Sequence, residues 1–350
     1  MSEAAPTLRA RNAARLLAQA DIAATAKPFK ALPVVDISPL MSGDAHARAQ
    51  VGAAIRSACL EVGFFYIVNH AVPDATIKAA FAATEWFFDL PLESKLAVSN
   101  TKSAAMRGYT GLLEENTDPD NNGDLHEAFD LSLDLSPDDP DAQKGIYGWA
   151  PNQWPESGEV DDFRTPIMAY HAALQHLSER LYRAFALSLD LDETFFDHML
   201  TKPVAELRLL HYPPQAQATD DKQIGIGAHS DYDVFTILAT DDVPALEVLN
   251  SAGDWIAAPP IPGAFIVNVG DLLERWTNDL YRSTVHRATN RTGQRRYSLP
   301  FFSNVNPMQT IAVLDSCISP QRPARYAPVG AAAYVEACMQ DAYGIASDTP

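Results

Sequence analysis

Cysteine is scarce in this sequence. Only Cys59, Cys317 and Cys338 occur among 350 residues, and no two of them form a CxxC motif. An odd number of widely spaced thiols is typical of reduced cysteines, and not of a disulfide framework or a zinc site. We therefore expect a cytoplasmic protein.

Basic residues and long apolar runs are also in short supply. Lys and Arg number 26 against 45 Asp and Glu, which gives a net charge of −19. Such a protein repels nucleic-acid phosphates and anionic membranes, so neither is expected as a partner. No apolar stretch reaches the roughly 18 residues of a membrane-spanning helix. Residues 1–30 lack the apolar core of a secretory signal and are expected to form a flexible helical leader.

Three common catalytic signatures are missing. The sequence has no GxSxG elbow and no Walker A motif. Gly225 and Gly227 lack the third glycine and the following helix of a dinucleotide fingerprint. These absences disfavour a serine hydrolase, a P-loop enzyme and a nicotinamide-dependent dehydrogenase.

Apolar periodicity predicts two differently built halves. Before residue 200, helices are expected at 46–63, 75–90 and 163–191, with strands at 32–40 and 64–70. From residue 205, seven or eight short β-rich runs alternate with turn residues, as in closed or sandwiched β architectures. The segment 329–344 is expected to be a final helix. The predicted regions are a leader (1–30), an α/β region (31–200), a β catalytic core (201–315) and a C-terminal helix with tail (316–350).

A candidate metal site lies in the second half. His229 and Asp231 are separated by one residue, so both side chains leave the same face of a strand and can reach one ion. His286 supplies a second imidazole 55 residues after Asp231. Two imidazoles and a carboxylate suit octahedral iron(II) and leave three positions open. The same donors accept oxidised iron or zinc, so donor type leaves the metal undecided.

A candidate anion site follows the last of these ligands. Arg296 and Ser298 are also separated by one residue, so their guanidinium and hydroxyl groups share one strand face. This pair is suited to holding a carboxylate through charge-assisted hydrogen bonds.

These motifs together resemble a known family. With the segments LPVVDI, VGFFYIVNH, LRLLHYPPQ, IPGAFIVNVGDLLERWTN and RRYSLPFF, the chain is similar over about residues 32–345 to isopenicillin N synthase-like iron(II)/2-oxoglutarate-dependent dioxygenases. Some segments, such as IGIGAHSDYD, are most similar to bacterial ethylene-forming enzyme. The resemblance implies a mainly β fold with flanking helices, a distorted double-stranded β-helix or cupin-like jelly roll.

The resemblance also implies cofactors and their ligands. His229, Asp231 and His286 would bind Fe(II), Arg296 and Ser298 would bind the distal carboxylate of 2-oxoglutarate, and O2 would be the second co-substrate. The expected reaction is hydroxylation or desaturation of a small molecule, with release of succinate and CO2. Two alternatives stay open: an iron oxidase of the isopenicillin N synthase type that needs no 2-oxoglutarate, and a non-catalytic sensor on the same fold.

Further site residues are expected by position. Where plant relatives carry Asn-x-Tyr, this chain has Leu210 and Tyr212, and Tyr212 is a candidate donor to 2-oxoglutarate. The segment 107–118 lies where relatives line the substrate pocket. The candidate substrate residues, each with an alternative structural role, are Arg107, Tyr109, Glu114, Asn268 and Phe302.

Much of the acidity is local. The segment 114–141 holds 11 acidic residues and no Lys or Arg, and its turn formers predict mostly loop. We hypothesise that this segment favours neutral or cationic, amino-acid-like substrates by electrostatic focusing. The alternative is a solvated loop without such a role.

Overall fold

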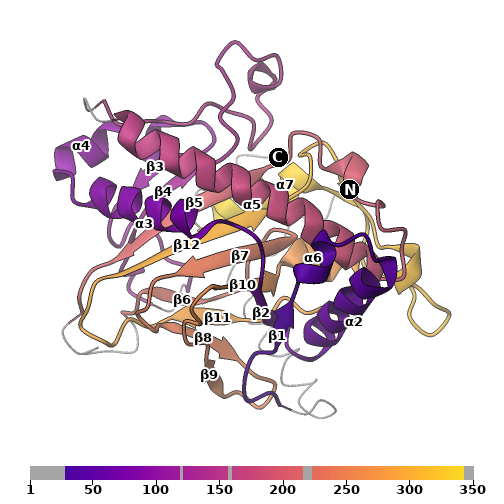
Figure 1. The fold of residues 1–350 in the computed structure, drawn as a ribbon. Coiled ribbons are helices and arrows are strands. Elements are labelled where there is room, and N and C mark those ends of the chain that lie inside the picture. Colours follow the sequence, from indigo (N-terminus) through magenta and orange to yellow (C-terminus); the bar gives the residue numbers. More distant parts are fainter. Residues whose placement is uncertain (1–27, 119–120, 157–159, 216–222, 343–350) are drawn as a thin grey trace.

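Two β-sheets face each other and enclose a cavity (Figure 1). The computed structural model describes residues 28–118, 121–156, 160–215 and 223–342. The large sheet has the order β1-β2-β10-β7-β12-β5-β4-β3, with β1 Val34–Asp36, β2 Phe64–Val68, β3 Gly108–Thr110, β4 Glu127–Leu131, β5 Ala205–Tyr212, β7 Phe235–Thr240, β10 Ala264–Val269 and β12 Arg296–Ser303. The small sheet has the order β6-β11-β8-β9, with β6 Ile226–His229, β8 Leu246–Leu249, β9 Trp255–Ala257 and β11 His286–Ala288.

Helices cover the outer face of the large sheet (Figure 1). The helices that contact this sheet from outside are α2 Ala45–Glu61, α3 Asp74–Phe88 and α5 Val160–Ser188. The other helices are α4 Leu92–Ala97, α6 Asp271–Trp276 and α7 Ala331–Ala342, and a short strand pair, β13 Thr310–Ile311 and β14 Val329–Gly330, precedes α7. The short 3-10 helices are η1 Ser38–Met41, η2 Asn100–Lys102, η3 Ala142–Lys144, η4 Asp197–Met199 and η5 Asp315–Cys317. The predicted mainly β fold with flanking helices is confirmed, and the expected helices start and end within three residues of α2, α3 and α5.

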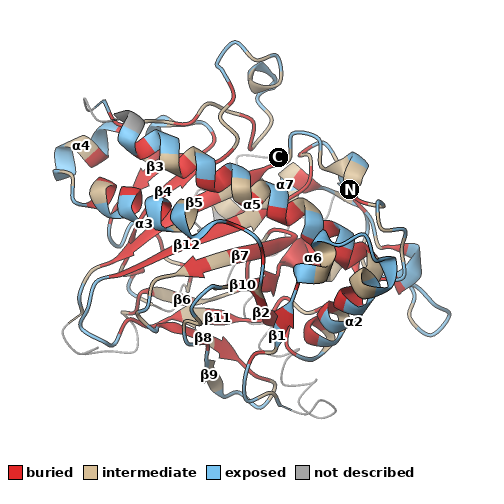
Figure 2. Cartoon of the chain, viewed as in Figure 1, coloured by how far each residue is buried: buried red, intermediate tan, exposed pale blue. Residues whose placement is uncertain are grey.

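The long helix α5 anchors the hydrophobic core. Its apolar residues recur every three or four positions and are buried, as a helix that lies on a sheet requires: Phe163, Ile167, Tyr170, Leu174, Leu177 and Leu181. The buried side of α5 faces the large sheet, and its exposed side faces outward (Figure 2). On the buried side, His171 Nε2 lies 2.7 Å from the carbonyl oxygen of Ala205 and its ring contacts Phe301 of β12 edge-on, so His171 has a structural role.

Alternation along β5 connects this core to the cavity. Leu207 and Leu209 are buried in the core cluster that includes the α5 side chains. Glu206, Arg208, Leu210 and Tyr212, at the alternate positions, line the cavity. One strand therefore supports the core with one face and supplies polar side chains to the cavity with the other.

Among the described residues, the expectation of mostly loop over 114–141 is confirmed, except at residues 127–131. These residues form β4, which pairs with β5, and all five are buried. Glu127 binds Lys95 at 2.7 Å, and Asp130 binds Arg208 at 2.7 Å. The acidic residues are tolerated inside the sheet because buried cations pair with them, which composition alone does not reveal.

The two ends of the chain extend past the described residues. The expected leader falls almost entirely in 1–27, which lie outside them, as do residues 343–350. The expected final helix corresponds to α7. Among the described residues, no helix is both long and apolar enough to cross a membrane.

Candidate metal centre and active-site cavity

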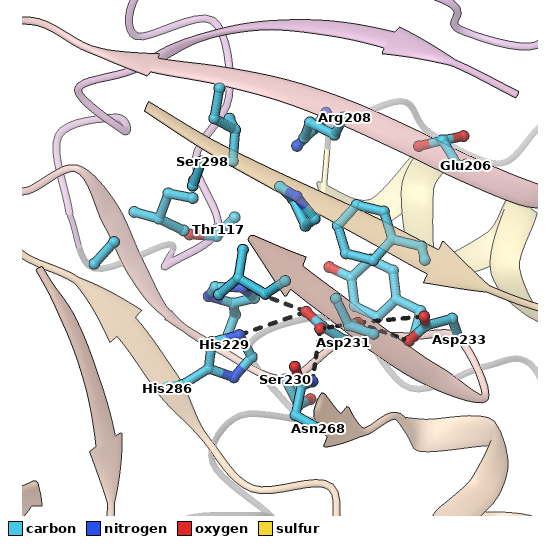
Figure 3. A pocket seen from close by; sticks show the side chains of 18 of the residues that line it. Thr117, Glu206, Arg208, His229, Ser230, Asp231, Asp233, Asn268, His286 and Ser298 are labelled. Atoms are coloured by element: carbon cyan, nitrogen blue, oxygen red, sulfur yellow. Dashed lines mark hydrogen bonds and ion pairs between the residues drawn. The ribbon is translucent and has the colours of Figure 1, made fainter. Parts of the chain in front are cut away.

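The three expected metal ligands converge on the small sheet. His229 ends β6 and His286 begins β11, and the two are direct partners in the antiparallel register. Asp231 follows two residues after β6, and its Oδ1 lies 3.6 Å from Nε2 of each imidazole (Figure 3). The potential ligand atoms all lie within 4.8 Å of one another.

Backbone carbonyls fix the orientation of both imidazoles. Nδ1 of His229 lies 2.8 Å from the carbonyl oxygen of Gly227, and Nδ1 of His286 lies 3.2 Å from that of Thr284. Because a carbonyl oxygen only accepts hydrogen bonds, each Nδ1 carries a proton, so Nε2 is the ring nitrogen on the side of Asp231 that can coordinate a cation. Burial, with the neighbouring imidazole, lowers the pKa of His286 to about 4. Two imidazole nitrogens and a carboxylate oxygen are donor types that fit iron(II).

The second carboxylate oxygen of Asp231 is held by the large sheet. Asn268 Nδ2 donates to Asp231 Oδ2 at 2.8 Å, and Thr236 Oγ1 donates to the same oxygen. Asn268 of β10 and Thr236 of β7 are register partners, so neighbouring strands supply both donors. Desolvation opposes the charge of Asp231, but the imidazoles and these donors outweigh it and lower its pKa.

A close backbone approach explains the glycine that precedes this site. A Cβ on Gly227 would lie 2.6 Å from Cβ of Asp118. The Gly227 N–H donates to Asp124 at 2.8 Å, while its carbonyl accepts from His229. The glycine therefore allows β6 to lie against the acidic segment, and it is not part of a nucleotide fingerprint.

The expected anion site lies on β12 and β5. Arg296 Nη1 lies 3.5 Å from Ser298 Oγ, and this hydroxyl lies 3.5 Å from the Tyr212 hydroxyl. Arg296 is the register partner of Tyr212, and its Cζ lies 4.6 Å from the centre of the tyrosine ring. All three side chains are buried. Among the described residues, no carboxylate forms an ion pair with Arg296, so this buried guanidinium can accept a carboxylate from a ligand.

Comparisons with known proteins agree with this geometry. A model of the N-terminal region of non-haem dioxygenases in morphine synthesis matches residues 32–157, and the 2OG-Fe(II) oxygenase superfamily model matches residues 203–305. The 2-oxoglutarate-Fe(II) type oxidoreductase hxnY of Emericella nidulans is 35% identical over 319 residues, covering 89% of this chain and 90% of that protein. The chain belongs to the 2-oxoglutarate/Fe(II) oxygenase family.

Other members agree in sequence and in structure. A homoarginine-6-hydroxylase of rice (Oryza sativa subsp. japonica) is 35% identical over 83% of this chain and 90% of that protein. The structure of Neurospora crassa T7H in complex with alpha-KG has a TM-score of 0.78 at 29% identity, covering 89% of this chain and 96% of that one. The expectations of a double-stranded β-helix, an enzyme, and the cofactors Fe(II), 2-oxoglutarate and O2 are confirmed.

The oxygenase has a polar wall that the sequence analysis missed. Arg208 binds Asp130 through Nε and Nη2, at 2.7 and 3.0 Å, and binds both oxygens of Glu115 through Nη1, at 3.0 and 2.9 Å. His126 Nε2 lies 3.2 Å from Glu115. Desolvation acts against the Glu115 charge, but Arg208 and His126 lower its pKa to about 2. Counting back in steps of two from Tyr212 would have indicated Arg208 as a cavity residue.

The expected substrate residues of the oxygenase fall into two groups. Asn268 and Phe302 line the cavity, whereas Arg107, Tyr109 and Glu114 are not among its lining residues. Buried Arg107 donates to the carbonyls of residues 133, 148 and 150. Tyr109 donates to a buried carboxylate at 2.6 Å, and Glu114 accepts from a backbone N–H of its own loop at 2.8 Å. These three side chains therefore bind partners within the protein outside the cavity lining.

Proposed function

We propose that the oxygenase holds Fe(II) through His229, Asp231 and His286 and oxidises a small molecule in the cavity between the two sheets. The observation that supports this assignment is the convergence of two imidazoles and one carboxylate, with ligand atoms within 4.8 Å of one another, in a cavity that also contains Arg296. In the same proposal, Arg296 and Ser298 bind the distal carboxylate of 2-oxoglutarate.

The surrounding side chains position these groups. When bound, iron(II) supplies the oxidative decarboxylation of 2-oxoglutarate to succinate and CO2 and the hydroxylation or desaturation of a substrate C–H bond. Thr236 and Asn268 both donate hydrogen bonds to Asp231 Oδ2, so Oδ1 is the oxygen that would bind the metal. Phe64 contacts the His286 ring edge-on at 5.1 Å and restricts its rotation. The Tyr212 hydroxyl, which lies beside Ser298, would donate to 2-oxoglutarate.

A small, neutral or cationic substrate fits the cavity. Relatives include structures titled as complexes with thymine and with JA, and the homoarginine-6-hydroxylases. The cavity of about 130 Å³ leaves room for a molecule of that scale. The other arginines that line the cavity form ion pairs within the protein: Arg208 with two carboxylates, and Arg287 with Glu247 at 2.7 Å. A second anionic ligand beside 2-oxoglutarate would therefore lack a counter-charge. An amino-acid-like substrate remains part of this proposal, as does a cytoplasmic location, which the small number of widely spaced cysteines in the sequence supports.

The test is succinate formation from 2-oxoglutarate in the presence of iron(II) and oxygen, which proceeds slowly even without a known substrate. We expect His229→Ala to abolish it. The matched control is His176→Ala, because the His176 side chain is 75% exposed on α5. Equal activity of the two variants would refute the ligand assignment.

A further inference from the structure

Glu206 is a carboxylate without a counter-charge in the cavity. It lies on the inward face of β5, two positions from Arg208, and lines the cavity together with the triad (Figure 3). Within the part of the chain that the structure describes, Glu206 has neither a hydrogen-bond nor an ion-pair partner. An ionised carboxylate without a partner lowers the stability of the folded protein, unless a ligand donates a hydrogen bond to it or a proton neutralises it.

The two nearest cations cannot serve Glu206. Arg208 is engaged by two other carboxylates, through its Nε and both terminal nitrogens. Arg107 is engaged by three backbone carbonyls and by Asn152. Both arginines still act on Glu206 through space. Burial, with repulsion from Asp130, nevertheless raises the pKa of Glu206 to about 7.

The cavity that contains Glu206 also has an apolar lining. Its apolar members include Val204, which precedes β5, Phe302, which is the register partner of Glu206 on β12, and Val335 and Met339 of α7. These apolar side chains favour a ligand with an apolar body. The Glu206 carboxylate favours a ligand whose polar nitrogen lies at its own end of the cavity. In Figure 3, Glu206 lies on the strand that faces His229, Asp231 and His286 across the cavity, so a ligand held there would extend towards the metal.

We propose that Glu206 recognises a cationic nitrogen of the substrate, an amidine, guanidine or amine, and thereby directs the remainder of the molecule towards the triad. The planar N–H pair of an amidine or guanidine matches both oxygens of the carboxylate. This inference rests on the proposed function, because it assigns Arg296 to 2-oxoglutarate and leaves Glu206 as the unbalanced charge of the substrate region.

The test compares three ligands of one shape and different charge: benzamidine, benzamide and benzoate. Calorimetry under anaerobic conditions measures their binding to the full-length protein loaded with iron(II) and 2-oxoglutarate. We expect benzamidine to bind about tenfold or more tightly than benzamide, and benzoate to bind most weakly. In Glu206→Gln the preference for benzamidine disappears, while Glu206→Asp retains part of it. Glu93→Gln is the control, because Glu93 is exposed at the start of α4.

Each outcome decides the inference. Equal affinities of the wild type for benzamidine and benzamide overturn it, as does a preference that persists in Glu206→Gln. The absorption band of iron-bound 2-oxoglutarate, recorded in the same samples, tests the proposed function separately. A missing band in the wild type contradicts that function, whereas an intact band with no preference for benzamidine contradicts only the role of Glu206.

Discussion

Replacing Glu206 with glutamine removes a charge that the cavity disfavours, and the effect on stability depends on pH. The pKa of Glu206 rises from 4.5 to about 7, chiefly because the side chain is desolvated. Between these values the folded protein keeps a proton that the unfolded chain has lost. The free energy of unfolding therefore falls as pH rises through this window.

The size of the effect follows from the shift. One pKa unit corresponds to about 1.4 kcal/mol, so the ionised carboxylate costs about 3 kcal/mol once the pH exceeds 7. Roughly 2 kcal/mol of this cost develops between about pH 5.5 and pH 8.5. The charged groups that act on Glu206, which are Asp130, Glu115, Arg107 and Arg208, are present in both proteins.

Urea unfolding at about pH 5.5 and pH 8.5 measures this difference. We expect the free energy of unfolding of Glu206→Gln, relative to that of the wild type, to be about 2 kcal/mol more favourable at the higher pH than at the lower pH. The exposed Glu93→Gln should gain nothing. A stability difference that is the same at both pH values would refute the reasoning, because it would mean that the folded protein stabilises the ionised form of Glu206 as well as water does.

Three further changes test other parts of the site. Asn268→Leu removes a donor to Asp231 and should weaken metal binding about tenfold or more, as calorimetric titration with Mn(II) would show; unchanged affinity would contradict the positioning role. Arg296→Lys keeps the charge but loses the planar fork, so KM for 2-oxoglutarate should rise about tenfold, whereas the exposed Arg164→Lys should leave KM unchanged. Arg208→Met removes the cation that binds Asp130 and leaves Glu115 with His126 alone, which should lower the free energy of unfolding by about 3 kcal/mol or more. An unchanged urea midpoint would argue against the ion-pair network.

Strand geometry explains which parts of the site could be predicted from sequence. His229 with Asp231, and Arg296 with Ser298, are each separated by one residue, and alternation places such pairs on one face of a strand without further information. The adjacency of His286 and His229 depends on pairing between β11 and β6, which are far apart in sequence. Spacing offered His286 as a third ligand, but only the family resemblance and the register place it there.

Side chains with buried partners could not be predicted in this way. Arg107 was expected to face the substrate, but it is satisfied by carbonyls brought together from distant loops. Similarly, Glu115 and Asp130 looked like solvated acids of one charged segment until Arg208 was found between them. Composition gives the charge of such residues but does not identify their partners. By contrast, the alternation along β5 predicts that Arg208 and Glu206 face the cavity, as Tyr212 does.

The most direct test of the metal and co-substrate assignment is an anaerobic titration of the iron(II)-loaded protein with 2-oxoglutarate, followed by visible absorption. We predict a charge-transfer band that saturates at one equivalent in the wild type and in His176→Ala, and that is absent in His286→Ala. A band of full intensity in His286→Ala, or no band in the wild type, would contradict the account.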